Sequence, residues 1–425
     1  MLWFFLGWFA LMILGIPISF SMIISTSAYL LFTGDVLTMI PQRMMAGSSN
    51  FTTLAIPFFM LAAQVTNVGG ITDRIYDFSK AFLGHIRGSL GHVNVMASII
   101  FAGKSGSGAA DVAGLGPIEM EAQRKAGFDD DFNVGVTLSS ATMAPVTPPS
   151  IPLVLYGSLA GVSVGALFMG GIIPGLLMGA SLFVMVYVYA KKRNYPIYPK
   201  ATWKQRWIAT KKSFWALLTP AIIFFGIVIG FVTPTEAAAL TIVYSMILIL
   251  FVYREFNLKG FMNVVLDTVE TIGTVILLMA AAGLLGWTIT RAQLPQTFAV
   301  KLMSITNSPL GFLLIMNFFL LFMGLFLEGL AILVILVPII MPMLPIVGVD
   351  PVHFGVVMVM NVTIGAITPP VGTYLFIMAK VANMPLEKVI KGVLPWTIPL
   401  IIVLFLVTIF PIFIMILPRL AGLVG

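Results

Sequence analysis

Most of the chain consists of apolar stretches of roughly 20 residues or more, the length that a helix needs to cross the core of a membrane. Short polar segments separate them. The first stretch has no basic start of a cleaved signal peptide, because the first charged residue is Asp35, and we interpret it as one retained helix. We predict uninterrupted spans over residues 1–32, 50–68, 166–190, 213–232, 236–253, 261–290 and 392–417.

Four further apolar stretches are interrupted by polar residues, glycine or proline. In 93–119 and about 308–345, each side of the interruption is too short to cross a membrane as a helix, so we predict two re-entrant helical hairpins. In 132–156 and 352–380, Thr-Pro-Pro sequences predict two broken helices. The pattern predicts an all-α polytopic membrane protein with about nine spans and two hairpins.

The interrupted stretches form an internal repeat. Shifted by 221 residues, segment 101–174 aligns without a gap with segment 322–395, and Thr147-Pro148-Pro149 falls on Thr368-Pro369-Pro370. The matched residues are mostly Gly, Pro, Thr and Asp, which set the shape of the backbone rather than fill a core. The other matches include Gly103 with Gly324, Gly108 with Gly329, Pro117 with Pro338, Thr142 with Thr363, Gly171 with Gly392 and Pro174 with Pro395.

The charged residues predict the orientation of the repeats. The chain is 59% hydrophobic and 9% charged, and its net charge of +7 is concentrated in segment 191–212, which carries eight Lys and Arg residues and no acid. Such loops mark the cytoplasmic side of a membrane, so the charge does not indicate a nucleic-acid partner. The loop after the first hairpin carries Arg124 and Lys125, whereas the equivalent loop at 343–350 carries neither Lys nor Arg. We therefore predict inverted repeats over 1–190 and 236–425, joined by a cytoplasmic loop and linking helix at 191–235.

Inverted repeats with paired broken helices indicate a secondary transporter with a binding site near the membrane midplane. A broken helix leaves main-chain polar groups unpaired, and in hydrocarbon such breaks persist only where another group completes them. Carbonyl oxygens suit a hard cation such as sodium, and helix N-termini favour anions. The sequence therefore predicts two cation sites with an anionic solute between them.

The candidate ligands lie in the hairpin tips and the breaks. Ser105 and Ser107 occupy the first tip, where they either bind ion or solute or cap helices; Glu328 occupies the second, where it either binds solute or pairs locally. Lys104 either steers an anion or extends its amine toward water, and Asp111 is open between pairing and binding. The threonines at the breaks either bind or hydrogen-bond to their own helices: Thr142, Thr147, Thr363 and Thr368.

Several kinds of chemistry have no signal in the sequence. Cysteine is absent, the three histidines lack ligand-like spacing, and no nucleophile stands beside a base, so we expect neither an enzyme nor a metal site other than for sodium. We expect no organic cofactor.

The motifs together resemble one family, and the resemblance covers essentially the whole chain. Phe101-Ala-Gly-Lys-Ser-Gly-Ser-Gly-Ala-Ala-Asp111, Thr233-Pro-Thr-Glu-Ala237 and the two Thr-Pro-Pro sequences are similar to those of the large membrane subunit (DctM/SiaM type) of TRAP, or tripartite ATP-independent periplasmic, transporters. The resemblance implies a multi-pass protein of the bacterial inner membrane. Its implied partners are a small four-helix membrane subunit of the DctQ/SiaQ type and a periplasmic substrate-binding protein. Because the chain starts at its own first span, we expect the small subunit to be a separate chain.

The resemblance also implies a mechanism and a set of ligands. Uptake of an organic anion, sialic acid or a C4-dicarboxylate, would be driven by a sodium gradient, with an elevator-like movement of a hairpin-bearing transport domain against a scaffold. The implied solute-binding residues are Ser107, Thr147, Ser150 and Glu328, with Glu328 standing where the shorter aspartate is expected. The implied sodium-binding residues are Ser105, Ala144 and Thr147 at one site and Gly324, Gly365 and Thr368 at the other.

Two other functions are compatible with parts of the pattern. One is a self-sufficient, sodium-coupled di- or tricarboxylate carrier of related architecture. The other is an antiporter-like subunit of a redox-driven ion pump, which would place buried Lys and Glu along several span centres, whereas most span interiors here are uncharged.

Overall fold

The computed structural model describes residues 2–49, 51–68, 71–195, 197, 199–228, 230–254, 257–294, 296–297, 306 and 308–424, and every regular element in these residues is a helix. Among them, six helices are long and apolar enough to cross a membrane, or seven if α4 and α5 form one bent span. The prediction of about nine spans also counted broken helices, whose halves are each shorter than this length.

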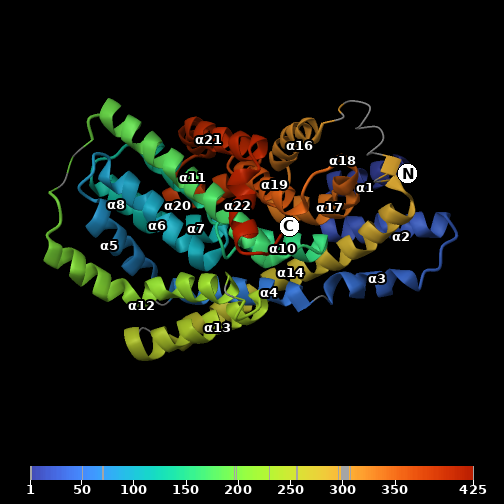
Figure 1. Cartoon of the computed structure of the whole chain (residues 1–425), viewed down its shortest axis with the longest axis horizontal. Helices are drawn as coiled ribbons and strands as arrows, with labels where there is room; N and C mark the ends of the chain where they lie inside the picture. Colours follow the sequence, from blue (N-terminus) through green and yellow to red (C-terminus); the bar gives the residue numbers. More distant parts are fainter. Residues whose placement is uncertain are drawn as a thin grey trace.

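An outer layer of helices lies along one side of the molecule, the lower side in Figure 1. It contains α2 (Ile18–Phe32), α3 (Met39–Ser48), α4 (Ala55–Val68), α12 (Trp203–Val228), α13 (Pro234–Ile247) and α14 (Leu258–Arg291). The helices α3 and α14 cross closely, since a Cβ atom added to Gly47 would lie 2.9 Å from the Cα atom of Gly283. Only glycine on both helices permits this approach. The short η1 (Phe51–Leu54) precedes α4, and the π-helix η2 (Leu248–Tyr253) follows α13.

The remaining helices form a hairpin-bearing unit. Its first half contains α6 (Ser89–Ser105), α7 (Gly108–Gly114), α8 (Gly116–Lys125), α9 (Asp130–Ala141), α10 (Ile151–Ala160) and α11 (Val164–Lys192). Its second half contains α16 (Pro309–Gly324), α17 (Gly329–Ile340), η3 (Met341–Met343), α18 (Leu344–Val347), α19 (Pro351–Gly365), α20 (Thr373–Ala382), α21 (Leu386–Ile409) and α22 (Ile412–Leu420). The amphipathic α5 (Ile71–Leu83) connects the outer layer to the first hairpin.

Equivalent helices of the two halves begin at equivalent residues. The starts of α7 and α17, and those of α9 and α19, are each 221 residues apart, as are the cis peptide bonds Pro148–Pro149 and Pro369–Pro370. This spacing agrees with the offset of the sequence repeat. The inversion of one repeat relative to the other stays a prediction.

The prediction of one span over residues 1–32 is wrong. The structure divides this stretch into α1 (Leu2–Ile13) and α2, and the ring centroids of Phe4 and Tyr29 lie 5.8 Å apart, so the two helices fold back on each other. The reversal follows from two residues that no helix interior favours: Gly15 has a φ of +84°, and Pro17 precedes α2.

Side-chain caps fix where many helices begin. The hydroxyl of Thr233 accepts a hydrogen bond from the amide of Glu236 at 3.3 Å, and the Glu236 carboxylate accepts from the Thr233 amide at 2.7 Å. This reciprocal capping box starts α13. In the same way, Asp350 accepts from the amides of Val352 and His353 and starts α19.

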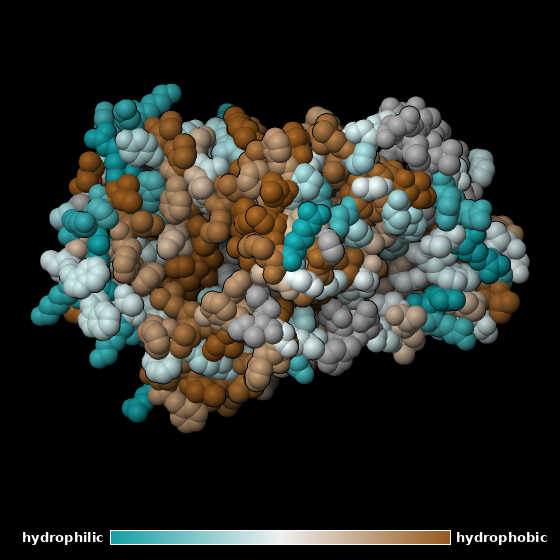
Figure 2. All heavy atoms as spheres, in the orientation of Figure 1, coloured by the Kyte–Doolittle hydropathy of each residue, from teal (hydrophilic) through white to brown (hydrophobic). Residues whose placement is uncertain are grey.

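The surface fits a membrane environment at the middle of the molecule. In Figure 2, hydrophobic residues dominate the centre of the visible face and hydrophilic residues gather toward the two ends of the long axis. Large exposed hydrophobic side chains lie on helices of both the outer layer and the hairpin-bearing unit. The chain is a multi-pass membrane protein.

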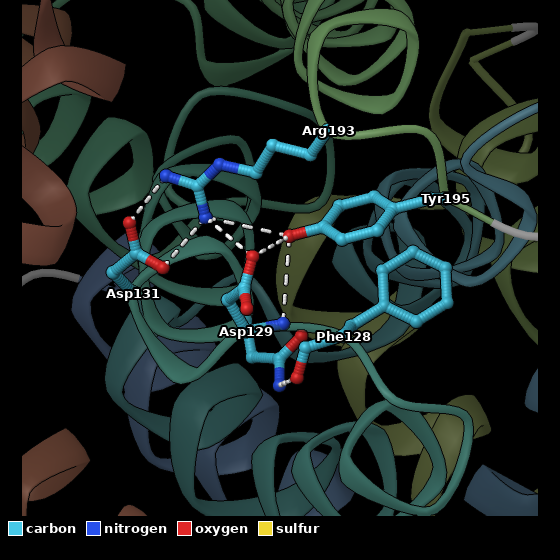
Figure 3. Close-up of polar contacts among 6 residues, drawn as sticks. Phe128, Asp129, Asp131, Arg193 and Tyr195 are labelled. Atoms are coloured by element: carbon cyan, nitrogen blue, oxygen red, sulfur yellow. Dashed lines mark hydrogen bonds and ion pairs between the residues drawn. The ribbon is translucent and has the colours of Figure 1, made fainter.

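A polar cluster joins the loop before α9 to the end of α11 (Figure 3). Arg193 donates hydrogen bonds to both carboxylate oxygens of Asp131, at 2.8 and 2.6 Å, and to Asp129 at 2.8 Å. Tyr195 donates to Asp129 at 2.7 Å, and its ring lies 4.4 Å from that of Phe128. The hydrogen bonds from Arg193 lower the pKa of Asp131, and burial, together with the bond to Asp129, raises the pKa of Tyr195 to about 12.

We expect Arg193→Gln to lower the thermal midpoint by about 2 °C at pH 7, which corresponds to about 1 kcal/mol for exposed ion pairs. A carboxylate with a lowered pKa contributes stability above its ordinary pKa, and that contribution is lost as the pH falls through the lowered value. The difference from the wild type should therefore narrow below a pH of about 4. Thermal unfolding in detergent measures the difference in midpoint, and Lys192→Gln is the neighbouring control. Equal midpoints of wild type and Arg193→Gln at pH 7 would show that the cluster does not stabilise the fold.

Candidate functional site

Each hairpin tip is bonded to the broken helix of its own half. The carbonyl oxygen of Gly106, which has a φ of +59° in the first tip, accepts a hydrogen bond from the amide of Ile151 at 3.3 Å. In the second tip, the carbonyl of Leu325 accepts from the amide of Val371 at 3.1 Å. Both donors lie just beyond the Pro-Pro sequence of the break. The tips and the breaks therefore satisfy part of each other's unpaired main chain.

The two halves interlock around this region. The first-half helix α7 packs against the second-half helix α20, and α10 packs against α17. Tyr374 of α20 covers the first tip, since a Cβ atom added to Gly108 would lie 2.5 Å from its ring. The phenol of Tyr374 also lies within electrostatic range of Glu328 in the second tip. The beginnings of α7 and α20 thus meet around one aromatic side chain.

The convergence gives the region its electrostatic character. The first residues of α7, α10, α17 and α20 carry amides that no turn of their own helix satisfies, and each N-terminus carries partial positive charge. The breaks also present the carbonyl ends of α9 and α19. One region therefore offers donors for an anion and carbonyl oxygens for a cation.

Three of the four predicted solute-binding residues are helix caps. Ser107 accepts from the amide of Ala110 at 3.4 Å, and Glu328 accepts from the amide of Ala331 at 3.3 Å. Ser150 accepts from Leu153 at 3.1 Å and donates to the carbonyl of Pro145. The prediction that residues of both tips cap helices is therefore confirmed, and solute binding by the same residues stays a prediction.

The caps differ in what they can still offer to a solute. A serine hydroxyl has one proton to donate and two lone pairs. Ser150 is fully buried and its proton is used by Pro145, whereas the half-buried Ser107 keeps its proton available. Glu328 is exposed, so its carboxylate remains accessible while it caps α17. Ser107 and Glu328 are thus better placed for a solute than Ser150.

The predicted sodium-binding residues fall at the tips and at the ends of α9 and α19. Ser105 is buried, and its hydroxyl accepts from the Ser107 amide at 3.4 Å. In the second half, a Cβ atom added to Gly324 would lie 2.9 Å from the Cα atom of Gly365, so the tip and the break touch through glycine. These hydroxyl and carbonyl oxygens are of the kind that sodium prefers. Ala144 and Thr147 lie in the turn after α9, where the Thr147 amide bonds to the Met143 carbonyl at 2.9 Å.

Most of the threonines at the breaks hydrogen-bond to their own helices. Thr142 donates to the Ser139 carbonyl at 2.6 Å, Thr363 to Val359 at 2.7 Å and Thr368 to Ile364 at 2.7 Å. The alternative in which the threonines hydrogen-bond to their own helices is thus correct for these three hydroxyl groups. The lone pairs of the half-buried Thr368 remain available to a cation, whereas Thr142 and Thr363 are buried.

Lys104 points away from the tip. Its side chain is fully buried, and its amine donates to the Thr72 hydroxyl of α5 at 3.3 Å. The amine nitrogen lies 4.2 Å from the centroid of the Phe101 ring. It also lies within electrostatic range of Asp111. The alternative in which Lys104 extends to water is wrong, because burial between α5 and α6 encloses it.

Sequence reasoning missed a buried polar network in the first half. Asn94 donates to Glu119 at 2.8 Å and to Thr137 at 2.7 Å, and Ser140 donates to the Asn94 carbonyl oxygen at 2.8 Å. Ser98 continues the network from Ser140 to Asp111. The available signal was the presence of Asn94 and Glu119 at positions that are isoleucine 221 residues later. These bonds connect α6, α7, α8 and α9 and hold the first hairpin against the first broken helix.

Sequence comparison identifies a family over nearly the whole chain. Residues 5–413 match the family described as "Tripartite ATP-independent periplasmic transporter, DctM component". The chain is 45% identical to the sialic acid TRAP transporter large permease protein SiaM of Vibrio cholerae, over 97% of each chain. It is 38% identical to the C4-dicarboxylate TRAP transporter large permease protein DctM of Pseudomonas aeruginosa, over 93% of this chain and 92% of that one.

Two further similarities concern chain length and fold. The sialic acid TRAP transporter permease protein SiaT of Haemophilus influenzae is 41% identical over 98% of this chain, which spans 68% of that longer protein. The structure of the YdaH transporter of Alcanivorax borkumensis matches with a TM-score of 0.67 over 86% of each chain at 15% identity. The second match shows a shared fold and nothing about the solute.

We expect Glu328→Ala to reduce solute uptake by roughly 10- to 100-fold, because a hydrogen bond to a charged group contributes about 1.5–3 kcal/mol. Glu328→Gln keeps an oxygen for the Ala331 amide and controls for loss of the cap. Initial uptake rates, compared at equal amounts of monodisperse protein, measure the effect. Wild-type uptake by Glu328→Ala would exclude Glu328 from the solute site.

Proposed function

The chain belongs to the DctM component family of TRAP transporters, and from this premise we propose that it is the large permease subunit of a sodium-coupled importer of an organic anion. The importer works in the bacterial inner membrane. A small four-helix membrane subunit and a periplasmic substrate-binding protein are its partners, and the latter delivers the solute. Family membership supports both partners.

One observation carries the proposal: each hairpin tip is bonded to the break of its own half, and the two halves interlock through α7 with α20 and α10 with α17. The N-termini attract the solute's anionic group, and the free hydroxyl proton of Ser107 donates to it. Sodium binds to carbonyl and hydroxyl oxygens beside the tips, at Ser105, Ala144 and Thr147 and at Gly324, Gly365 and Thr368. Sodium thereby neutralises the carbonyl ends while the solute neutralises the N-termini, which couples the two binding events.

The division into layers supports an elevator-like mechanism. Both tips and both breaks belong to the hairpin-bearing unit, while α3, α4, α13 and α14 pack mainly on one another. A unit that contains the whole site can move against a layer that contributes little to it. The site then faces one side of the membrane at a time.

Sequence identity favours sialic acid over a C4-dicarboxylate as the solute. The sialic acid permease of V. cholerae is 45% identical to this chain, and the C4-dicarboxylate permease of P. aeruginosa is 38% identical.

Reconstitution in proteoliposomes tests the proposal. With both partners and an inward sodium gradient, we expect labelled sialic acid to accumulate, and replacement of sodium by potassium or omission of either partner should abolish accumulation. Uptake by this chain alone would instead indicate a self-sufficient carrier. Accumulation without a sodium gradient would contradict sodium coupling.

The same assay tests the ion sites. Ser105→Ala and Thr368→Ala each remove a hydroxyl oxygen beside a tip, and we expect both to raise the sodium concentration for half-maximal uptake severalfold. Thr363→Ala is the matched control, because its hydroxyl is buried and bonds to its own helix in the same way as that of Thr368. An unchanged sodium dependence in both variants would remove these residues from the ion sites.

A further inference from the structure

A cavity of about 290 Å³ lies where the outer layer meets the hairpin-bearing unit. The outer layer contributes Arg43 from α3 and Trp287 from α14, and the hairpin-bearing unit contributes Ser158 from α10 and Pro338 from α17. Figure 1 shows α14 running past α10 and α17, with α3 below it. After Pro338 the chain passes through η3 and α18 into segment 343–350, which carries neither Lys nor Arg, so we place the cavity toward the face opposite the cytoplasmic loops.

Arg43 brings an unneutralised positive charge to this cavity. Its guanidinium makes no hydrogen bond or ion pair with the described residues, and its Nε atom is enclosed without a partner. The guanidinium carbons of Arg43 and Arg291 lie 5.1 and 5.3 Å from the centroid of the Trp287 ring. Arg291, unlike Arg43, forms an ion pair with Asp35. An enclosed, unpaired guanidinium N–H costs free energy unless a ligand accepts its proton.

The other walls suit a small organic acid. The Trp287 ring beside the guanidinium offers an apolar face to a carbon skeleton, and the Ser158 hydroxyl is held by Thr53 at 2.9 Å. The volume is at the lower end of the range for small-molecule sites, roughly 300–1,000 Å³. A planar guanidinium with free N–H groups binds a carboxylate through two parallel hydrogen bonds.

The cavity is aligned with the hairpin tips along two helices. α10 begins after Ser150 and α17 begins after Glu328, and both run toward the cavity. Because a helix rises about 1.5 Å per residue, Ser158 lies about 12 Å beyond Ser150 and Pro338 about 15 Å beyond Glu328. A carboxylate bound at Arg43 would therefore lie roughly 12–15 Å from the tips along these two helices.

We propose that Arg43 forms a second anion site, at the junction of the outer layer and the hairpin-bearing unit, which binds the carboxylate of the solute before it reaches the hairpin tips. The inference rests on the proposed function for the identity of the anion. It goes beyond it by placing a carboxylate-binding residue on the outer layer.

The absence of cysteine makes a direct test possible. Ala46→Cys places a single thiol on the cavity wall, and its reaction rates with anionic and cationic methanethiosulfonates report the local charge. We expect Arg43→Gln to lower the anionic-to-cationic rate ratio by roughly three- to tenfold. The double variant Arg291→Gln with Asp35→Asn, which removes a neutralised pair beside the same ring, should leave the ratio unchanged.

A protection assay tests for the ligand itself. Sialic acid or succinate, at matched ionic strength, should slow alkylation of the Ala46→Cys thiol by the neutral N-ethylmaleimide when Arg43 is present. Protection should be lost in Arg43→Gln and weakened in Arg43→Lys, whose ammonium keeps the charge without the paired donors. A thiol introduced at Ala201, in the basic loop, is the control for nonspecific effects.

The outcomes separate this inference from the proposed function. Unprotected alkylation, or a charge ratio that does not depend on Arg43, overturns the anion site even if sodium-driven uptake is observed. Carboxylate protection that depends on Arg43 supports the site even if reconstituted uptake fails, because labelling in detergent requires no transport.

Discussion

Main-chain polar groups cannot remain unpaired in hydrocarbon, and this constraint governs the whole structure. The chain interrupts four helical segments in its interior, and each interruption releases amides and carbonyls. The protein satisfies part of them by bonding each tip to its own break, through Gly106 with Ile151 and Leu325 with Val371. The rest are gathered at one place by interlocking the two halves, where a solute and an ion complete them in our account.

The interlock explains why the capping residues coincide with the residues that we propose bind the solute. A residue that begins a helix at the centre of the unit lies both where a cap is needed and where a ligand arrives. Ser107 serves the helix with its lone pair and keeps a proton for the solute, whereas Ser150 uses both. The polar network from Asn94 to Glu119 and Thr137 holds the first hairpin against the first broken helix. Rigid placement of the tip thus depends on residues that have no ligand of their own.

The sequence predicts the site's backbone better than its packing. Glycine, proline and threonine act locally, so their pattern predicted the interruptions of the two hairpins and the breaks at the two Thr-Pro-Pro sequences, and the structure has helix ends at all four places. Tyr374 could not be predicted, because its role depends on contact with the other half. Hydropathy also failed at residues 1–32, where it measures the length of an apolar run but not the reversal that Gly15 and Pro17 introduce.

The central claim is that cargo and driving ion complete the unpaired main chain between the tips. A cryo-electron-microscopy map of the complex with its partner subunit, solute and sodium tests it most directly. We predict solute density against the N-termini of α7 and α17, beside Ser107 and Glu328, with ion density at the ends of α9 and α19. Solute bound elsewhere, or breaks that become continuous helix when it binds, would contradict the account.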